Sequence, residues 1–138
     1  MPPKPGQIRF YADESFLGTG KALTIARDDV VHVGHPLVLP QLPMGVLDPD
    51  WMPEVAKRGW IVLARDRRIR TKPAELAAFK AHGLRVFWMA GKKDLTNWGN
   101  LVRMVRRWDQ MESIIASRGA GPWFMAINEG NITEIGLK

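Results

Sequence analysis

Apolar runs and segments of helical period alternate along the chain. Short apolar runs predict strands at residues 8–12, 30–33, 60–64 and 84–89. Helices are expected between these strands, at residues 19–28, in a short segment that ends at Arg58, and at residues 73–82. A longer helix is expected over about residues 95–115. Its predicted apolar face consists of Leu95, Trp98, Val102, Val105, Trp108 and Ile115.

The end of the chain carries two more apolar runs, at residues 123–127 and 132–137, and the turn-forming residues 128–131 separate them. This pattern predicts a terminal hairpin or two short edge strands. Strands that alternate with helices are typical of a mostly parallel sheet with helices on both faces. In the commonest small arrangement, the first strand lies beside the third. We therefore expect an α/β three-layer sandwich in a single domain, residues 1–138, with a flexible N-terminus at residues 1–6.

Composition and charge narrow the function. A chain of 138 residues with 46% hydrophobic and 25% charged residues is typical of one globular domain. The lack of cysteine excludes disulfides and thiolate zinc sites and fits a cytoplasmic protein. Neither a signal peptide nor a membrane-spanning stretch is evident, so we expect no membrane association. The net charge of +6 favours a polyanionic partner, although such a charge can also simply maintain solubility.

Carboxylates follow two of the predicted strands. Asp13 and Glu14 come after the first strand, and Asp66 comes after the strand at residues 60–64. If these strands are neighbours, Asp13 and Asp66 lie side by side at the carboxyl edge of the sheet, where open α/β sheets place their active sites. Asp48 or Asp50, at the start of the helix before the third strand, is expected to add a third carboxylate, although Asp50 could instead cap that helix.

Such a cluster favours a metal ion. Carboxylates about 4 Å apart repel each other by on the order of 4 kcal/mol per pair at an effective dielectric constant of 20. A Mg²⁺ or Mn²⁺ ion would remove this repulsion, because both ions prefer oxygen ligands. The ion could also activate a water molecule for attack on phosphorus. The sequence therefore predicts a metal-dependent enzyme that acts on phosphate esters.

Basic residues surround the predicted ligand Asp66. A run of this kind is commonly a solvated surface, but its position beside an acidic site favours a track for the phosphates of an anionic substrate. The residues of this track are Arg65, Arg67, Arg68, Arg70 and Lys72.

Three segments together resemble a known family. They are Phe10-Tyr11-Ala12-Asp13-Glu14, Asp48-Pro49-Asp50-Trp51 and Val62-Leu63-Ala64-Arg65-Asp66-Arg67-Arg68-Ile69. The chain resembles, over about residues 7–136, the PIN-like ribonuclease domains of VapC-type toxins from bacterial toxin-antitoxin pairs. Two features depart from the usual pattern: the central acid is an aspartate in a loop rather than a glutamate on a helix, and arginines replace a fourth aspartate.

The resemblance implies a Mg²⁺- or Mn²⁺-dependent endoribonuclease that cleaves structured RNA, commonly tRNA or rRNA. It also implies a cognate antitoxin that holds the enzyme inactive. By position, Asp13, Asp48 and Asp66 would be metal ligands and catalytic residues, with Asp50 as an alternative ligand and Glu14 as an accessory acid. A homodimer is possible, and the number of metal ions is left open.

Two other functions are compatible with parts of the pattern. A catalytically inactive module that binds nucleic acid or protein would explain the positive charge equally well, but the acidic cluster would weaken its binding to RNA. A phosphoryl-accepting signalling domain shares the sheet and the acidic pocket but needs a lysine at a strand end, which is not evident.

Several other residues have an expected place. Asp28 and Asp29 lie at the opposite end of the sheet and are expected to be structural, whereas Glu112 is expected on a solvated helix face. Trp51 and Trp98 are the tryptophans we would test for stacking on RNA bases.

Overall fold

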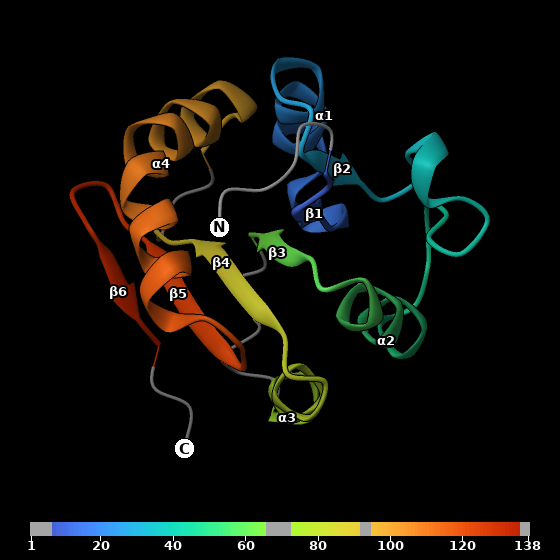
Figure 1. Cartoon of the computed structure of the whole chain (residues 1–138). Coiled ribbons are helices and arrows are strands. Elements are labelled where there is room, and N and C mark those ends of the chain that lie inside the picture. The colour runs from blue at the N-terminus through green and yellow to red at the C-terminus, as the bar shows by residue number, and fades with distance from the viewer. Residues whose placement is uncertain (1–6, 66–72, 92–94, 136–138) are drawn as a thin grey trace.

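The described residues, 7–65, 73–91 and 95–135, form a computed structural model built around one six-stranded sheet (Figure 1). Its strands are β1 (Phe10–Ala12), β2 (Val30–His32), β3 (Ile61–Ala64), β4 (Arg85–Met89), β5 (Trp123–Ile127) and β6 (Ile132–Glu134). Their order is β2-β1-β3-β4-β5-β6, and only β5 and β6 pair in antiparallel fashion. The mostly parallel sheet, the first strand beside the third and the terminal hairpin are therefore confirmed. The N-terminus for which flexibility is predicted, residues 1–6, lies outside the described residues.

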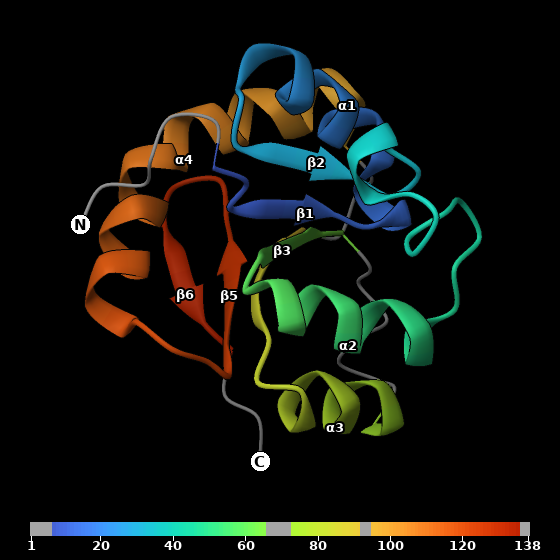
Figure 2. The ribbon, with the colours of Figure 1, turned by 45° about the vertical axis from the view of Figure 1, so that its right-hand side comes forward.

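Helices cover both faces of this sheet (Figure 1 and Figure 2). They are α1 (Leu17–Ala26), α2 (Asp48–Arg58), α3 (Pro73–Ala81) and α4 (Asn97–Arg118), with short 3₁₀ turns η1 (Glu14–Phe16) and η2 (Pro36–Val38). The helices α1 and α4 lie on one face, and α2 and α3 lie on the other. The expected three-layer α/β architecture is thus confirmed.

The sheet separates two hydrophobic cores, one on each face, and the side chains of β1 alternate between them. Phe10 and Ala12 face α1 and α4 and pack with Leu23 and Met104. Tyr11 faces the opposite way, into the core that α2 and α3 cover. All three residues of β1 are fully buried, because a parallel sheet with helices on both faces shields both sides of its central strands.

The predicted apolar face of α4 is partly wrong. Trp98 and Val105 are 72% and 62% exposed. The face that packs against the sheet consists of Leu101, Met104, Trp108, Met111 and Ile115. Both stripes have helical spacing and share Trp108 and Ile115, so periodicity alone cannot choose between them. Met104 and Met111 are almost fully buried in the core on this face of the sheet, which the sequence pattern does not reveal.

A close contact between α1 and β1 fixes the end of that strand. A Cβ atom placed on Gly20 would lie only 2.4 Å from the Cβ atom of Ala12. Two small residues therefore let the helix approach the strand directly before Asp13. A larger side chain at residue 20 would push α1 outward and displace the turn at Asp13.

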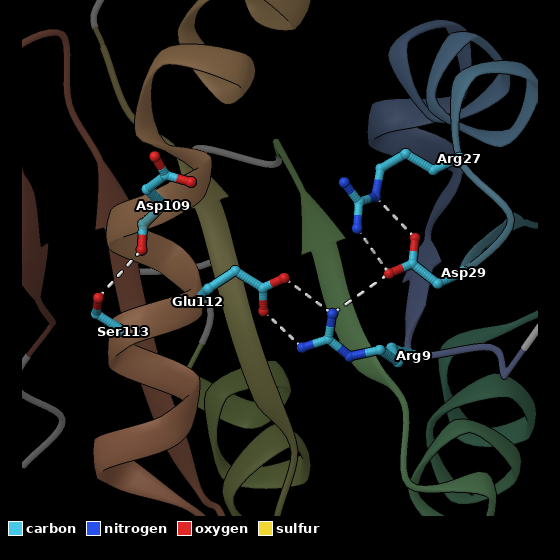
Figure 3. A network of polar contacts seen from close by, with 6 residues as sticks. All are labelled: Arg9, Arg27, Asp29, Asp109, Glu112 and Ser113. Carbon is cyan, nitrogen blue, oxygen red and sulfur yellow. Dashed lines mark hydrogen bonds and ion pairs between the residues drawn. The ribbon is translucent and has the colours of Figure 1, made fainter. Parts of the chain in front are cut away.

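A network of ion pairs joins α4 to the amino ends of β1 and β2 (Figure 3). Arg9 binds Glu112 through two hydrogen bonds, with Nη1 to Oε2 at 2.9 Å, and reaches Asp29 at 3.3 Å. Arg27 donates to both oxygens of Asp29, at 2.8 and 3.0 Å. The guanidinium of Arg27 also lies 4.4 Å from the ring centre of Trp108. Asp29 is therefore structural, as predicted, whereas Glu112, predicted on a solvated helix face, is partly exposed and is also bound to Arg9.

The arginines hold both carboxyl groups in the charged form. Burial raises the pKa of Asp29, but the hydrogen bonds and charges of Arg27 and Arg9 outweigh it, so the pKa lies below its ordinary value. Hydrogen bonding from Arg9 lowers the pKa of Glu112 more than burial raises it. Both groups therefore favour the folded state more strongly when they are ionised.

Replacing Glu112 with glutamine tests the contribution of this network. We expect Glu112→Gln to lower the free energy of unfolding by on the order of 1 kcal/mol, since it removes the charge from two hydrogen bonds at a partly exposed side chain. Denaturant unfolding measures this change. The control is Asp109→Asn, an exposed carboxylate on the same helix, and an equal effect in both variants would contradict the assignment.

The lowered pKa values also predict a dependence of stability on pH. The network contributes fully above about pH 5, where both groups are ionised even in the unfolded chain, and its contribution is lost as the pH falls below about 4. The melting temperature should follow this course. In Asp29→Asn the melting temperature should start lower at neutral pH and fall less in acid, and a parallel acid profile would show that Asp29 does not carry the effect.

Candidate active site

The carboxyl ends of β1 and β3 lie side by side. The N–H group of Asp13 donates to the carbonyl of Leu63 at 3.2 Å, and the N–H group of Arg65 donates to the hydroxyl of Ser15 at 2.9 Å. The chain directly after β1 is therefore tied to the chain directly after β3. Asp66 lies outside the described residues, so its predicted place beside Asp13 stays a prediction.

Asp13 is held by the turn that follows it. Its Oδ1 atom accepts a hydrogen bond from the N–H group of Ser15 at 3.0 Å and another from the Ser15 hydroxyl, and it caps η1. Ser15 thus links Asp13 to Arg65. Sequence reasoning did not include Ser15 in the site, although an aspartate commonly forms a local turn by accepting a hydrogen bond from the backbone N–H group two residues on.

A pocket of about 180 Å³ opens at this edge of the sheet. It is lined by Tyr11, Asp13, Glu14, Ser15, Val33, Val46, Asp48 and Trp51. Three of the predicted site residues, Asp13, Glu14 and Asp48, therefore meet around one cavity. Glu14 accepts a hydrogen bond from the N–H group of Gly45, which fixes it against the loop before α2.

Asp48 and Asp50 both belong to the first turn of α2, where the helix dipole favours negative charge. Asp48 accepts a hydrogen bond from Trp51 Nε1 at 2.8 Å and faces the pocket. Asp50 is exposed and is not one of the lining residues, and the cap position belongs to Leu47. The alternative role of Asp50 as the helix cap is therefore wrong.

Tyr11 forms part of the pocket wall that sequence reasoning missed. Its side chain is fully buried, and its ring lies 5.7 Å from that of Trp51 and 6.3 Å from that of Trp60, measured between ring centres. Burial, and then the charges of Asp13 and Glu14, raise the pKa of the Tyr11 hydroxyl well above its ordinary value, so it keeps its proton. The available signal was spacing, because residues two apart on a strand point to the same face.

Comparison with known families identifies the domain. Residues 8–91, more than half of the chain, match the family model described as a PIN like domain. The chain belongs to the PIN-like domain family. PIN-like domains are generally nucleases. Comparisons with curated proteins and with solved structures gave no match.

The match covers the acidic pocket of this PIN-like domain and ends before α4. Of the two tryptophans named for a test of RNA stacking, Trp51 is only 4% exposed and packs in the core, whereas Trp98 is 72% exposed and stays the candidate for that test. Within the described ranges, no helix is long and apolar enough to cross a membrane.

The pocket of the PIN-like domain has the donor chemistry of a hard-cation site. Its carboxylates are oxygen donors of the kind that Mg²⁺ and Mn²⁺ prefer. However, no three side chains of His, Cys, Asp or Glu among residues 7–65, 73–91 and 95–135 lie close enough to hold an ion by themselves. A complete ligand set would need a further group, and Asp66 is the one that the sequence predicts.

The predicted phosphate track is only partly visible. Arg65 follows β3 and is half-buried, and its backbone is fixed through Ser15. The remaining members, Arg67, Arg68, Arg70 and Lys72, lie outside the described residues, so the track stays a prediction.

The link through Ser15 can be tested directly. In Ser15→Ala we expect the amide proton of Arg65 to exchange faster, by roughly tenfold, because its acceptor is lost. Hydrogen exchange followed by NMR measures this rate. The control is Ser117→Ala, whose hydroxyl bonds only within α4; an unchanged exchange rate at Arg65 would contradict the proposed link.

Proposed function

We propose that this PIN-like domain is a Mg²⁺- or Mn²⁺-dependent endoribonuclease. The observation that supports this function best is the meeting of Asp13, Glu14 and Asp48 around one pocket at the carboxyl edge of the sheet. Membership of a family whose domains are generally nucleases points the same way.

In this proposal Asp13, Asp48 and Asp66 hold the cation, with Asp50 as the alternative ligand. A bound divalent cation would lower the pKa of an attacking water and offset the charge that develops on the phosphate. The protein's own groups set the geometry. Ser15 orients Asp13, Trp51 orients Asp48, and Glu14 serves as an accessory acid held by the backbone of Gly45.

We further propose that RNA binds through the basic residues that follow β3 in the sequence. An acidic pocket repels a phosphate chain unless positive side chains lie nearby. Arg65, Arg67, Arg68, Arg70 and Lys72 follow β3 in the sequence and would supply that charge. The net charge of +6 and the pI near 10.1 support a polyanionic substrate.

The finer biological role is proposed from the resemblance to VapC-type toxins. We propose a cytoplasmic toxin of a type II toxin-antitoxin pair that cleaves structured RNA, such as tRNA or rRNA. The cognate antitoxin would cover the basic track, and co-purification with the product of the neighbouring gene tests this. Absence of any complex would count against the toxin role.

A second candidate is an inactive module on the same fold that binds nucleic acid or protein. One observation favours it: the described carboxylates do not form a three-ligand metal cluster among themselves. The positive charge supports binding without cleavage equally well. Scission of RNA distinguishes the two functions.

Asp13→Asn provides the decisive comparison. We expect the wild type to cleave total RNA with Mn²⁺ but not with EDTA, and the Asp13→Asn variant to cleave it more slowly by a factor of more than about a hundred. The fold should be retained, since asparagine caps helical turns as well as aspartate does and one repelling charge is removed. The control is Asp28→Asn, an exposed residue at the other end of the sheet.

Thermal unfolding with and without Mg²⁺ provides a second readout for the same variants. The cation should raise the melting temperature of the wild type and of the control, but not that of Asp13→Asn. RNA binding without scission by the wild type would favour the inactive module.

A further inference from the structure

The Tyr11 hydroxyl is a buried polar group without a use in the fold. Tyr11 is fully buried, and its hydroxyl has no hydrogen-bond partner within the described residues. Buried hydroxyl groups are nearly always hydrogen-bonded, because losing water without gaining a partner is unfavourable. Phenylalanine would fill the same space between Trp51 and Trp60 without this cost. The hydroxyl therefore needs a partner that residues 7–65, 73–91 and 95–135 do not supply.

The position of Tyr11 limits where that partner can lie. Tyr11 and Asp13 are two residues apart and both line the pocket of about 180 Å³. Other polar groups on the pocket wall already have partners: Glu14 is bound to Gly45, and Asp48 to Trp51. Among the described residues that line the pocket, the Tyr11 hydroxyl is thus a buried donor without a partner, and an occupant of the pocket can accept its hydrogen bond.

The size of the pocket defines the class of occupant. A volume of about 180 Å³ has room for roughly six water molecules at about 30 Å³ each. Pockets for drug-sized organic ligands are larger, about 300–1,000 Å³. The cavity is therefore too small for a drug-sized ligand, and its volume suits a hydrated ion or a single phosphate group.

We infer that the Tyr11 hydroxyl donates a hydrogen bond to an oxygen atom of the ligand in this pocket and so positions that ligand against Asp13 and Asp48. This inference rests on the proposed nuclease function. The oxygen belongs either to a water that accompanies the divalent cation or to a phosphate of the substrate, and both are hydrogen-bond acceptors. Tyr11 is then a positioning residue, in addition to the carboxylates predicted from the sequence.

The chain contains a single tyrosine, which allows a direct test. Protein labelled with ¹³C-tyrosine gives one ring signal from the carbon that bears the hydroxyl, and this signal reports a new hydrogen bond. We expect it to shift on addition of Mg²⁺ alone if the partner is a water that accompanies the ion. A shift only after inorganic phosphate is added to the Mg²⁺ sample would assign the partner as a phosphate oxygen.

Tyr11→Phe gives the matching thermodynamic measurement. Without ligand we expect its melting temperature to equal or exceed that of the wild type, because an unpaired buried hydroxyl is removed. Its affinity for the ligand that shifts the signal should fall by roughly threefold to tenfold, as expected for one hydrogen bond. The control is Thr19→Val, which removes a buried hydroxyl that bonds to the carbonyl of Asn97, away from the pocket.

The outcomes separate this inference from the proposed function. If Mg²⁺ stabilises the wild type and Tyr11→Phe equally and the tyrosine signal does not move with Mg²⁺ or phosphate, the role of Tyr11 is overturned while metal binding stands. If neither Mg²⁺ nor Mn²⁺ changes the melting temperature of the wild type, the metal-dependent function fails and the inference fails with it. A shifted signal with weakened binding in Tyr11→Phe supports both.

Discussion

The candidate site depends on the parallel pairing of β1 with β3. In this register Tyr11 lies opposite Val62 and Ala12 lies opposite Leu63, so β1 ends within one residue of the end of β3. The hydrogen bond from the N–H group of Asp13 to the carbonyl of Leu63 continues the pairing beyond the end of β1. The hydrogen bond from the N–H group of Arg65 to the hydroxyl of Ser15 joins the two segments once more. Two segments that are fifty positions apart in sequence are thereby brought to one edge of the sheet. A shift of one residue would turn Asp13 and Tyr11 away from the pocket.

The sequence predicted local features well and distant contacts poorly. Strands 30–33 and 84–89 and the helix after Pro73 were recognisable because apolar runs and chain breakers lie close together in sequence. The pairing of β1 with β3 followed from the usual connectivity of alternating strands and helices. By contrast, Arg9 and Glu112 are 103 positions apart, and no local pattern connects them. The partly exposed position of Glu112 is thus predictable from the sequence, but its ion pair with Arg9 is not.

Within the site, residue type was easier to predict than supporting contacts. Asp13 and Asp48 were found because carboxylates near the carboxyl ends of parallel strands are candidate metal ligands. Tyr11 and Ser15 were missed because one looked like an ordinary core residue and the other like an ordinary turn residue. Their importance follows from which side chains they face, and that depends on the register of the sheet and on the turn at η1. The place of Asp66 is untested.

The ion pair between Arg9 and Glu112 also bears on where the chain can be truncated. The family match ends at residue 91, yet Arg9 at its beginning is bound to Glu112 beyond its end. β4 pairs along its whole length with β5, and β5 also lies beyond residue 91, where the match ends. A fragment that stopped at residue 91 would leave β4 as an open apolar edge and Arg9 without its main partner, and such edges promote aggregation. The matched segment, residues 8–91, therefore depends on the C-terminal third of the chain to remain folded.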